Sequence, residues 1–180
     1  MATPPTFSSG AILTAAQMNA VGLWLVKSQT IGTAVPSVTV TSAFSADFEN
    51  YLITISGGTA SANGGIAMQL NNSGSNTYSE AGTYGNYGIN SGVGYNPAAA
   101  FSWTDTLVGG TTTYSGSVFL SSPFASKATT GWTDATSQAS FYKFSLIDTS
   151  TNSSTGFTFT PLTGGSTLTG GTIRVYGYRN

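Results

Sequence analysis

Residues 172–178 read Thr-Ile-Arg-Val-Tyr-Gly-Tyr, and this stretch decides the fold class. Side chains alternate across a β-strand, so the apolar Ile173 and Val175 share one face while Arg174, Tyr176 and Tyr178 share the other. The two glycines before the stretch, Gly170 and Gly171, suit a sharp turn. The sequence therefore predicts a half-buried strand that completes a β-sandwich.

The same alternation recurs along the chain after residue 36. About eight segments place apolar side chains at every second position, and glycine, asparagine or proline lies between them. The apolar residues are Val38, Val40, Tyr51, Ile53, Ile55, Ile66, Met68, Leu70, Phe101, Trp103, Val118, Leu120, Tyr142, Phe144, Leu146, Phe157 and Phe159. This pattern predicts an all-β domain over residues 36–180, an antiparallel β-sandwich or jelly roll.

One helix is expected in the first 35 residues. Thr14 is a good N-cap, and Gln17, three residues later, completes a capping box. Apolar residues then recur near helical spacing, which predicts a helix from 15 to 26. Because so short a helix is marginal by itself, residues 1–35 are interpreted as an attachment arm. The arm would dock on its own sandwich, on other copies or on a larger assembly.

Six side chains of this arm are predicted to contact a particle or other copies: Phe7, Leu13, Met18, Val21, Trp24 and Leu25. Trp24 lies off the main apolar stripe of the expected helix. Tryptophan is favoured at interfaces, which suits docking in an assembly. Packing beneath the first strand explains its presence equally well.

The charge content is unusually low. Charged residues make up 6% of the chain, against about 25% in an ordinary globular domain. Five basic and six acidic residues form no basic run that would favour nucleic acid or an anionic membrane. We also find no signal peptide and no apolar stretch long enough to cross a bilayer, so we expect synthesis in a cytoplasm and no membrane insertion.

The sequence offers little for catalysis. It contains no histidine and no cysteine, which excludes a Ser-His-Asp triad and zinc sites built from thiolate or imidazole. Asp105, Asp134 and Asp148 could supply the two carboxyls of glycoside hydrolysis. Each has Thr or Ser neighbours in a turn-like context, where aspartate usually caps its own backbone. We therefore expect a protein that is not an enzyme, with no catalytic residue, metal or cofactor.

Residues 71–100 differ from the rest. Tyr78, Tyr84, Tyr87 and Tyr95 lie among glycines and asparagines there, a composition typical of recognition loops. The segment is one candidate for binding a glycan or a partner protein. The alternative is an insertion with one irregular strand whose tyrosines pack between subunits, since long loops often serve as scaffolding.

Three segments resemble proteins of tailed bacteriophages. Residues 7–20, FSSGAILTAAQMNA, are similar to an N-terminal motif of many phage structural proteins, including tail and head fibres. Residues 170–179, GGTIRVYGYR, are similar to the closing strand of phage receptor-binding and decoration domains, and residues 50–55, NYLITI, resemble a core strand of such domains. The resemblance implies a virion protein, usually a homotrimer, whose N-terminal segment attaches to the particle while the sandwich projects outward.

The absence of long repetitive segments indicates which type of virion protein to expect. We find neither extended repeats nor coiled-coil heptads, which favours a compact knob over a long fibre. The expected function is that of a capsid decoration or cement protein on the virion surface, bound to the major capsid protein or another virion protein. The alternative is a short tail-fibre or receptor-binding protein that recognises a host surface glycan.

Overall fold

A computed structural model shows that every regular element in the described part of the chain is a β-strand. The structure describes residues 9–10, 12, 22–71, 77–88 and 102–178, and the backbone of 92–95. The strands are β1 (Leu23–Thr30), β2 (Val38–Val40), β3 (Asn50–Ala60), β4 (Gly64–Leu70), β5 (Tyr78–Asn86), β6 (Gly92–Tyr95), β7 (Trp103–Gly109), β8 (Tyr114–Ser121), β9 (Thr129–Ser137), β10 (Ser140–Asp148), β11 (Phe157–Pro161), β12 (Leu168–Thr169) and β13 (Thr172–Tyr178).

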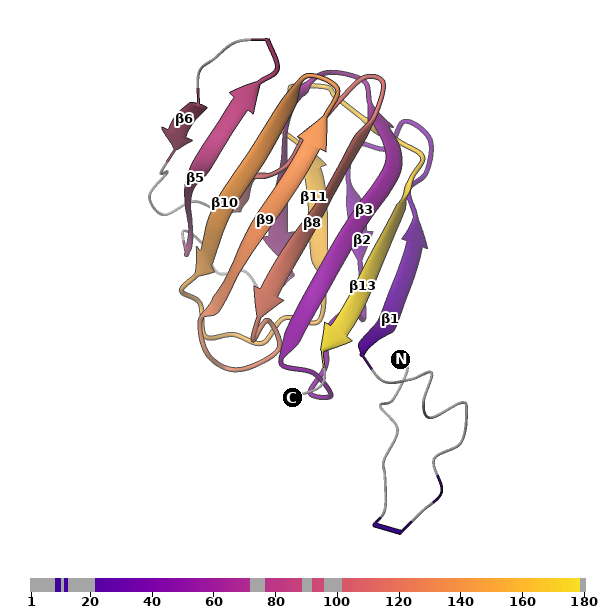
Figure 1. Ribbon diagram of the computed structural model, residues 1–180, viewed down its shortest axis with the longest axis vertical. Helices are drawn as coiled ribbons and strands as arrows, with labels where there is room; N and C mark the ends of the chain where they lie inside the picture. Colours follow the sequence, from indigo (N-terminus) through magenta and orange to yellow (C-terminus); the bar gives the residue numbers. More distant parts are fainter. Residues whose placement is uncertain are drawn as a thin grey trace.

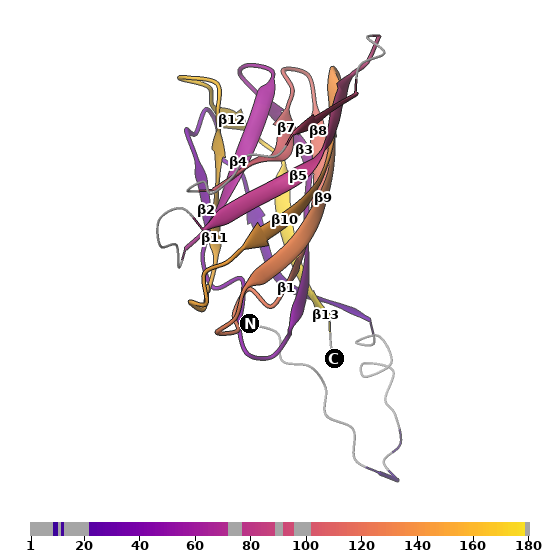
Figure 2. The same ribbon diagram turned by 90° about the vertical axis from the view of Figure 1, so that its left-hand side faces the viewer.

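These strands form two antiparallel sheets that lie face to face (Figure 1 and Figure 2). The larger sheet has the order β1-β13-β3-β8-β9-β10-β5-β6, with β12 paired to β3, and the smaller sheet has the order β2-β11-β4-β7. The predicted all-β, antiparallel fold is confirmed. The jelly-roll connectivity is not confirmed, because β8, β9 and β10 follow one another as a simple meander within one sheet.

The stretch at 172–178 forms the strand that the sequence predicts. As β13 it pairs with β1 on one side and with β3 on the other. Ile173 and Val175 are fully buried, and Arg174, Tyr176 and Tyr178 are partly exposed, as the alternation requires. Gly170 and Gly171 both have positive φ, 64° and 87°, so the turn before β13 uses a conformation that other residues rarely adopt.

Aromatic side chains fill much of the space between the sheets. Tyr51, Tyr78, Trp103 and Tyr114 are among the largest fully buried side chains. The Tyr51 hydroxyl accepts a hydrogen bond from the Ser45 backbone N–H (2.8 Å) and donates one to the Ser45 carbonyl (2.9 Å), so this buried polar atom is satisfied. At Tyr51 the core thus combines close packing with a polar group whose partners are fixed, whereas the buried hydroxyl of Tyr114 has no hydrogen-bond partner.

The predicted helix from 15 to 26 is wrong wherever the structure describes it. Residues 23–26 belong to β1, which pairs with β13 from Leu23 opposite Tyr178 to Thr30 opposite Thr172. Pairing with β13 satisfies the backbone of this segment and buries Val26, and these gains outweigh a weak local preference for helix. Residues 15–21 of the predicted helix lie outside the described residues. The interval 1–35 therefore includes an edge strand of the larger sheet.

Candidate functional site

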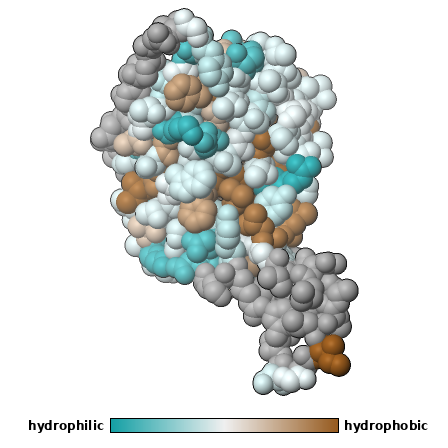
Figure 3. Space-filling view, viewed as in Figure 1, coloured by the Kyte–Doolittle hydropathy of each residue, from teal (hydrophilic) through white to brown (hydrophobic). Residues whose placement is uncertain are grey.

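Apolar side chains line up across five strands on the outer face of the larger sheet. We call this row the outer band; it consists of Leu25, Tyr176, Leu52, Phe119 and Trp132, each paired with the next. Side chains directly opposite one another on antiparallel strands are close enough to interact, so the row forms one strip. Figure 3 views this face and shows apolar residues gathered among hydrophilic ones.

Two aromatic contacts hold the end of the outer band that lies on β8 and β9. The rings of Phe119 and Trp132 are nearly parallel, at 11°, with centroids 5.9 Å apart. Tyr178 meets Phe119 edge-on at 5.9 Å. Trp132 nevertheless keeps 47% of its surface exposed, which is unusual for a side chain of this size and marks it as a candidate binding residue.

The next row across the sheet is polar. Pairing places Thr54 beside Arg174, Ser117 beside Thr54, Asp134 beside Ser117 and Lys143 beside Asp134. The carboxylate of Asp134 on β9 forms an ion pair with the ammonium group of Lys143 on β10. On this side the outer band is therefore bordered by hydroxyl groups, by the guanidinium group of Arg174 and by one ion pair.

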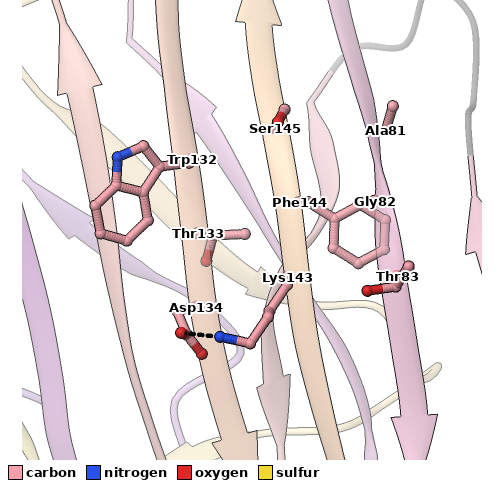
Figure 4. A pocket seen from close by; sticks show the side chains of 9 residues that line it. All are labelled: Ala81, Gly82, Thr83, Trp132, Thr133, Asp134, Lys143, Phe144 and Ser145. Atoms are coloured by element: carbon pink, nitrogen blue, oxygen red, sulfur yellow. Dashed lines mark hydrogen bonds and ion pairs between the residues drawn. The ribbon is translucent and has the colours of Figure 1, made fainter. Parts of the chain in front are cut away.

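A shallow hollow of about 320 Å³ lies where the outer band meets this polar row. We call it the Trp132 hollow. Its lining residues are Ala81, Gly82, Thr83, Trp132, Thr133, Asp134, Lys143, Phe144 and Ser145. Figure 4 shows the indole of Trp132 to one side of the Asp134–Lys143 pair, with Ser145 on the same strand as Lys143 and Thr83 on the next strand. An apolar ring, a donor, an acceptor and hydroxyl groups thus surround one opening.

A second cluster lies inside the molecule, where β5 of the larger sheet meets β7 of the smaller one. Glu80 is 3% exposed. Its Oε1 accepts hydrogen bonds from the Thr104 backbone N–H (2.8 Å) and from the Thr104 hydroxyl. The Asp105 backbone N–H donates to the same carboxylate at 3.2 Å. One buried carboxylate therefore joins the two sheets.

The carboxyl groups of this cluster resist ionisation. Burial raises the pKa of Glu80, and the hydrogen bonds from Thr104 and Asp105 only partly oppose it. Burial and then repulsion from Glu80 raise the pKa of Asp105 to about 6. Burial, together with nearby Asp105, Tyr84 and Glu80, raises the pKa of Tyr142 to about 12, so its phenol stays neutral in ordinary buffers.

The raised pKa of Asp105 predicts how stability depends on pH. The folded pKa, about 6, exceeds the ordinary value of 3.8, so the folded state holds the proton more tightly. The resulting stabilisation is complete below about pH 4 and is lost as pH rises through 6, a loss of ~1–3 kcal/mol after allowance for solvent screening. We expect the free energy of unfolding in urea to fall between pH 4.5 and 7.5.

The matched variant is Asp105→Asn, which keeps the shape and removes the titration. It should make the fall between pH 4.5 and 7.5 smaller and should be more stable than the parent at pH 7.5, while the raised pKa of Glu80 leaves part of the fall in place. Asp134→Asn, on the outer face, is the control and should leave the fall in place. A parent protein whose stability is unchanged or rises over this interval would contradict the assignment.

The three aspartates considered for glycoside hydrolysis do not come together. Asp134 is on the outer face, Asp148 is fully buried at the end of β10, and Asp105 lies on β7. The turn-like context was wrong for Asp105 and Asp134, which lie within strands, because Thr and Ser also suit strands. Asp148 does cap its own backbone, since its Oδ1 accepts from the Ser150 N–H at 3.0 Å.

The tyrosines of the predicted recognition loop have different environments. Tyr78 is fully buried, packs edge-on against Trp103 at 5.0 Å and receives a hydrogen bond from the Leu70 N–H, which corrects its assignment to a recognition surface. Tyr84 is partly buried against Tyr142, with ring centroids 5.6 Å apart. Tyr87 is 55% exposed. The side chain of Tyr95 lies outside the described residues.

The predicted attachment residues also differ in their environments. Phe7, Leu13, Met18 and Val21 lie outside the described residues. Trp24 packs partly buried against the core, but it does so from within β1 and not from a helix beneath the first strand. Leu25 is 46% exposed and begins the outer band. Of the predicted side chains that the structure describes, Leu25 is thus available for contact.

Sequence reasoning missed the residues that now matter most. The sequence pattern singles out neither Trp132 nor Phe119 as a binding residue. Glu80 was not considered, although Tyr78, Glu80 and Tyr84 alternate on one face of a strand. The position of Glu80 on the same strand face as these two tyrosines was the signal that its carboxylate is buried.

Three further observations bear on function. Within the described residues, no group of three or more acidic, histidine or cysteine side chains is placed to hold a metal ion. In the same part of the chain, no helix is long and apolar enough to span a membrane. No protein-family model matches the chain, and no match was found among curated proteins or solved structures.

Proposed function

We propose that this chain is a structural protein of a bacteriophage particle, a decoration or cement protein that binds the shell and projects its β-domain from the virion surface. The observation that carries the proposal is the position of β1. The segment that resembles the phage N-terminal motif leads directly into this edge strand, and Leu23 and Leu25 on it are 47% and 46% exposed. An edge strand with outward leucines suits contact with another protein.

Other features support the same proposal. Two sheets joined by one hydrophobic core make a rigid domain, and the interactions of a surface with few charges depend little on salt. The separation of the three aspartates supports a role other than catalysis. A homotrimer, with the major capsid protein or another virion protein as partner, remains part of the proposal.

Attachment is tested with purified particles that lack the protein. We expect the full chain to sediment with them, and a chain without residues 1–21 to stay in the supernatant. Because the deletion leaves β1 and its pairing with β13 intact, the truncated domain should keep its melting temperature. Equal sedimentation of a folded truncated chain would refute attachment through this segment.

A single substitution tests the contribution of β1. Leu25→Ser should weaken particle binding by roughly tenfold, which corresponds to the loss of one buried leucine contact. The control is Leu162→Ser, a residue of similar exposure, 48%, that lies outside the outer band. If both variants bind alike, the outer face of β1 is not the contact.

The number of copies per particle separates the two virion roles. Quantitative mass spectrometry against the major shell protein should give a number comparable to that protein for decoration or cement. A handful of copies would favour the tail-associated, receptor-binding alternative.

A further inference from the structure

We propose that the Trp132 hollow is a saccharide-binding site, in which one pyranose ring stacks on the indole of Trp132 and its hydroxyl groups bond to Asp134 and Lys143. This inference concerns the β9 end of the outer band, whereas the particle-attachment proposal rests on the N-terminal segment and on β1 at the edge of the sheet, so it stands independently of that proposal.

The first support is the apolar platform. A pyranose ring carries C–H groups on its faces and hydroxyl groups around its rim. The face of an aromatic ring is electron-rich and attracts such C–H groups. Trp132 is exposed to 47%, and its near-parallel contact with Phe119 fixes the indole orientation, so little entropy is lost when a ligand stacks on it.

The second support is the hydrogen-bonding capacity beside the platform. A carboxylate accepts several hydrogen bonds, and an ammonium group has three donors, so the Asp134–Lys143 pair retains capacity for a ligand. Pairing in register on β9 and β10 holds the two groups together. Adjacent sugar hydroxyls both donate and accept, so they complement a donor and an acceptor held side by side.

The third support is the composition of the hollow, which favours a sugar over a protein. The centres of protein interfaces are depleted in Ala, Ser, Lys and Asp, and the Trp132 hollow is lined by Ala81, Ser145, Lys143 and Asp134. Its volume, about 320 Å³, lies at the small end of the range for ligand sites. Both facts fit one or two sugar rings with further units extending over the hydroxyl-rich face.

The test begins with the labelled full chain on an array of immobilised bacterial O-antigens, capsular polysaccharides and glucans. We expect binding to at least one polysaccharide. A soluble fragment of the strongest binder is then titrated by calorimetry. Trp132→Ala should weaken that binding at least ~10-fold, and Asp134→Asn should weaken it less. Each variant is accepted only if its melting temperature is unchanged.

Ile147→Ala is the matched control, since this residue is 37% exposed on the same face but does not line the hollow. It should bind as the parent does. Absence of binding to every polysaccharide, or undiminished binding by folded Trp132→Ala, would overturn the proposal. A third result would also overturn it. If the parent binds no polysaccharide and Trp132→Ala no longer sediments with particles, the hollow contacts a protein and not a sugar.

Discussion

Glu80→Ala is expected to lower the free energy of unfolding by about 3 kcal/mol or more. The substitution removes the carboxylate that accepts hydrogen bonds from the Thr104 and Asp105 backbone N–H groups and from the Thr104 hydroxyl. A buried donor without a partner costs more than the bond itself contributes in net terms. Urea unfolding at pH 7 measures the loss.

Two variants show whether the loss comes from these hydrogen bonds. Glu80→Gln keeps one acceptor oxygen and removes the repulsion with Asp105, so it should lose much less than Glu80→Ala. Thr83→Ala, at an exposed position on the same strand, should change stability little. An alanine variant as stable as the parent would show that Glu80 does not join the two sheets energetically.

Gly177→Ala is expected to cost about 2–3 kcal/mol of stability, because the site has no room for a methyl group. An added Cβ would lie within 2.6 Å of both Cδ atoms of the Phe48 ring. Phe48 is itself buried and packs edge-on against Tyr51, with ring centroids 5.9 Å apart. The ring cannot withdraw without opening the core beneath β13. Thermal and urea unfolding measure the cost.

The contact with Phe48 can be isolated by a double-mutant cycle. Phe48→Leu should reduce the further cost of Gly177→Ala, since a smaller side chain leaves space for the methyl group. Gly164→Ala is the control: an added Cβ there meets nothing within 4 Å, and the backbone conformation is open to alanine. Equal, small effects at both glycines would contradict the packing described for Gly177.

These residues also show how far a single sequence could predict the structure. The alternation in residues 172–178 correctly gave a strand and its buried face, because the residues that define the pattern are neighbours in the chain. In residues 15–26 the spacing of apolar side chains suited a helix, yet Leu23–Thr30 forms β1. The deciding interaction there is pairing with β13, which lies at the other end of the sequence.

The candidate site was largely beyond prediction for the same reason. Leu25, Leu52 and Trp132 belong to strands far apart in the sequence, and only the register of the larger sheet places them in one row. Glu80 and Asp105 likewise meet because β5 and β7 belong to different sheets that pack together.

The sequence by itself therefore determined the all-β class, the buried face of the strands with clear alternation and the scarcity of charge. The tertiary structure decided the order of the strands, the role of β1 as an edge, the outer band and the Trp132 hollow. The physical reason is the separation along the sequence of the residues that interact. Alternation is fixed by backbone geometry between adjacent residues, whereas register and sheet packing depend on contacts between distant segments, which form only when the whole chain folds.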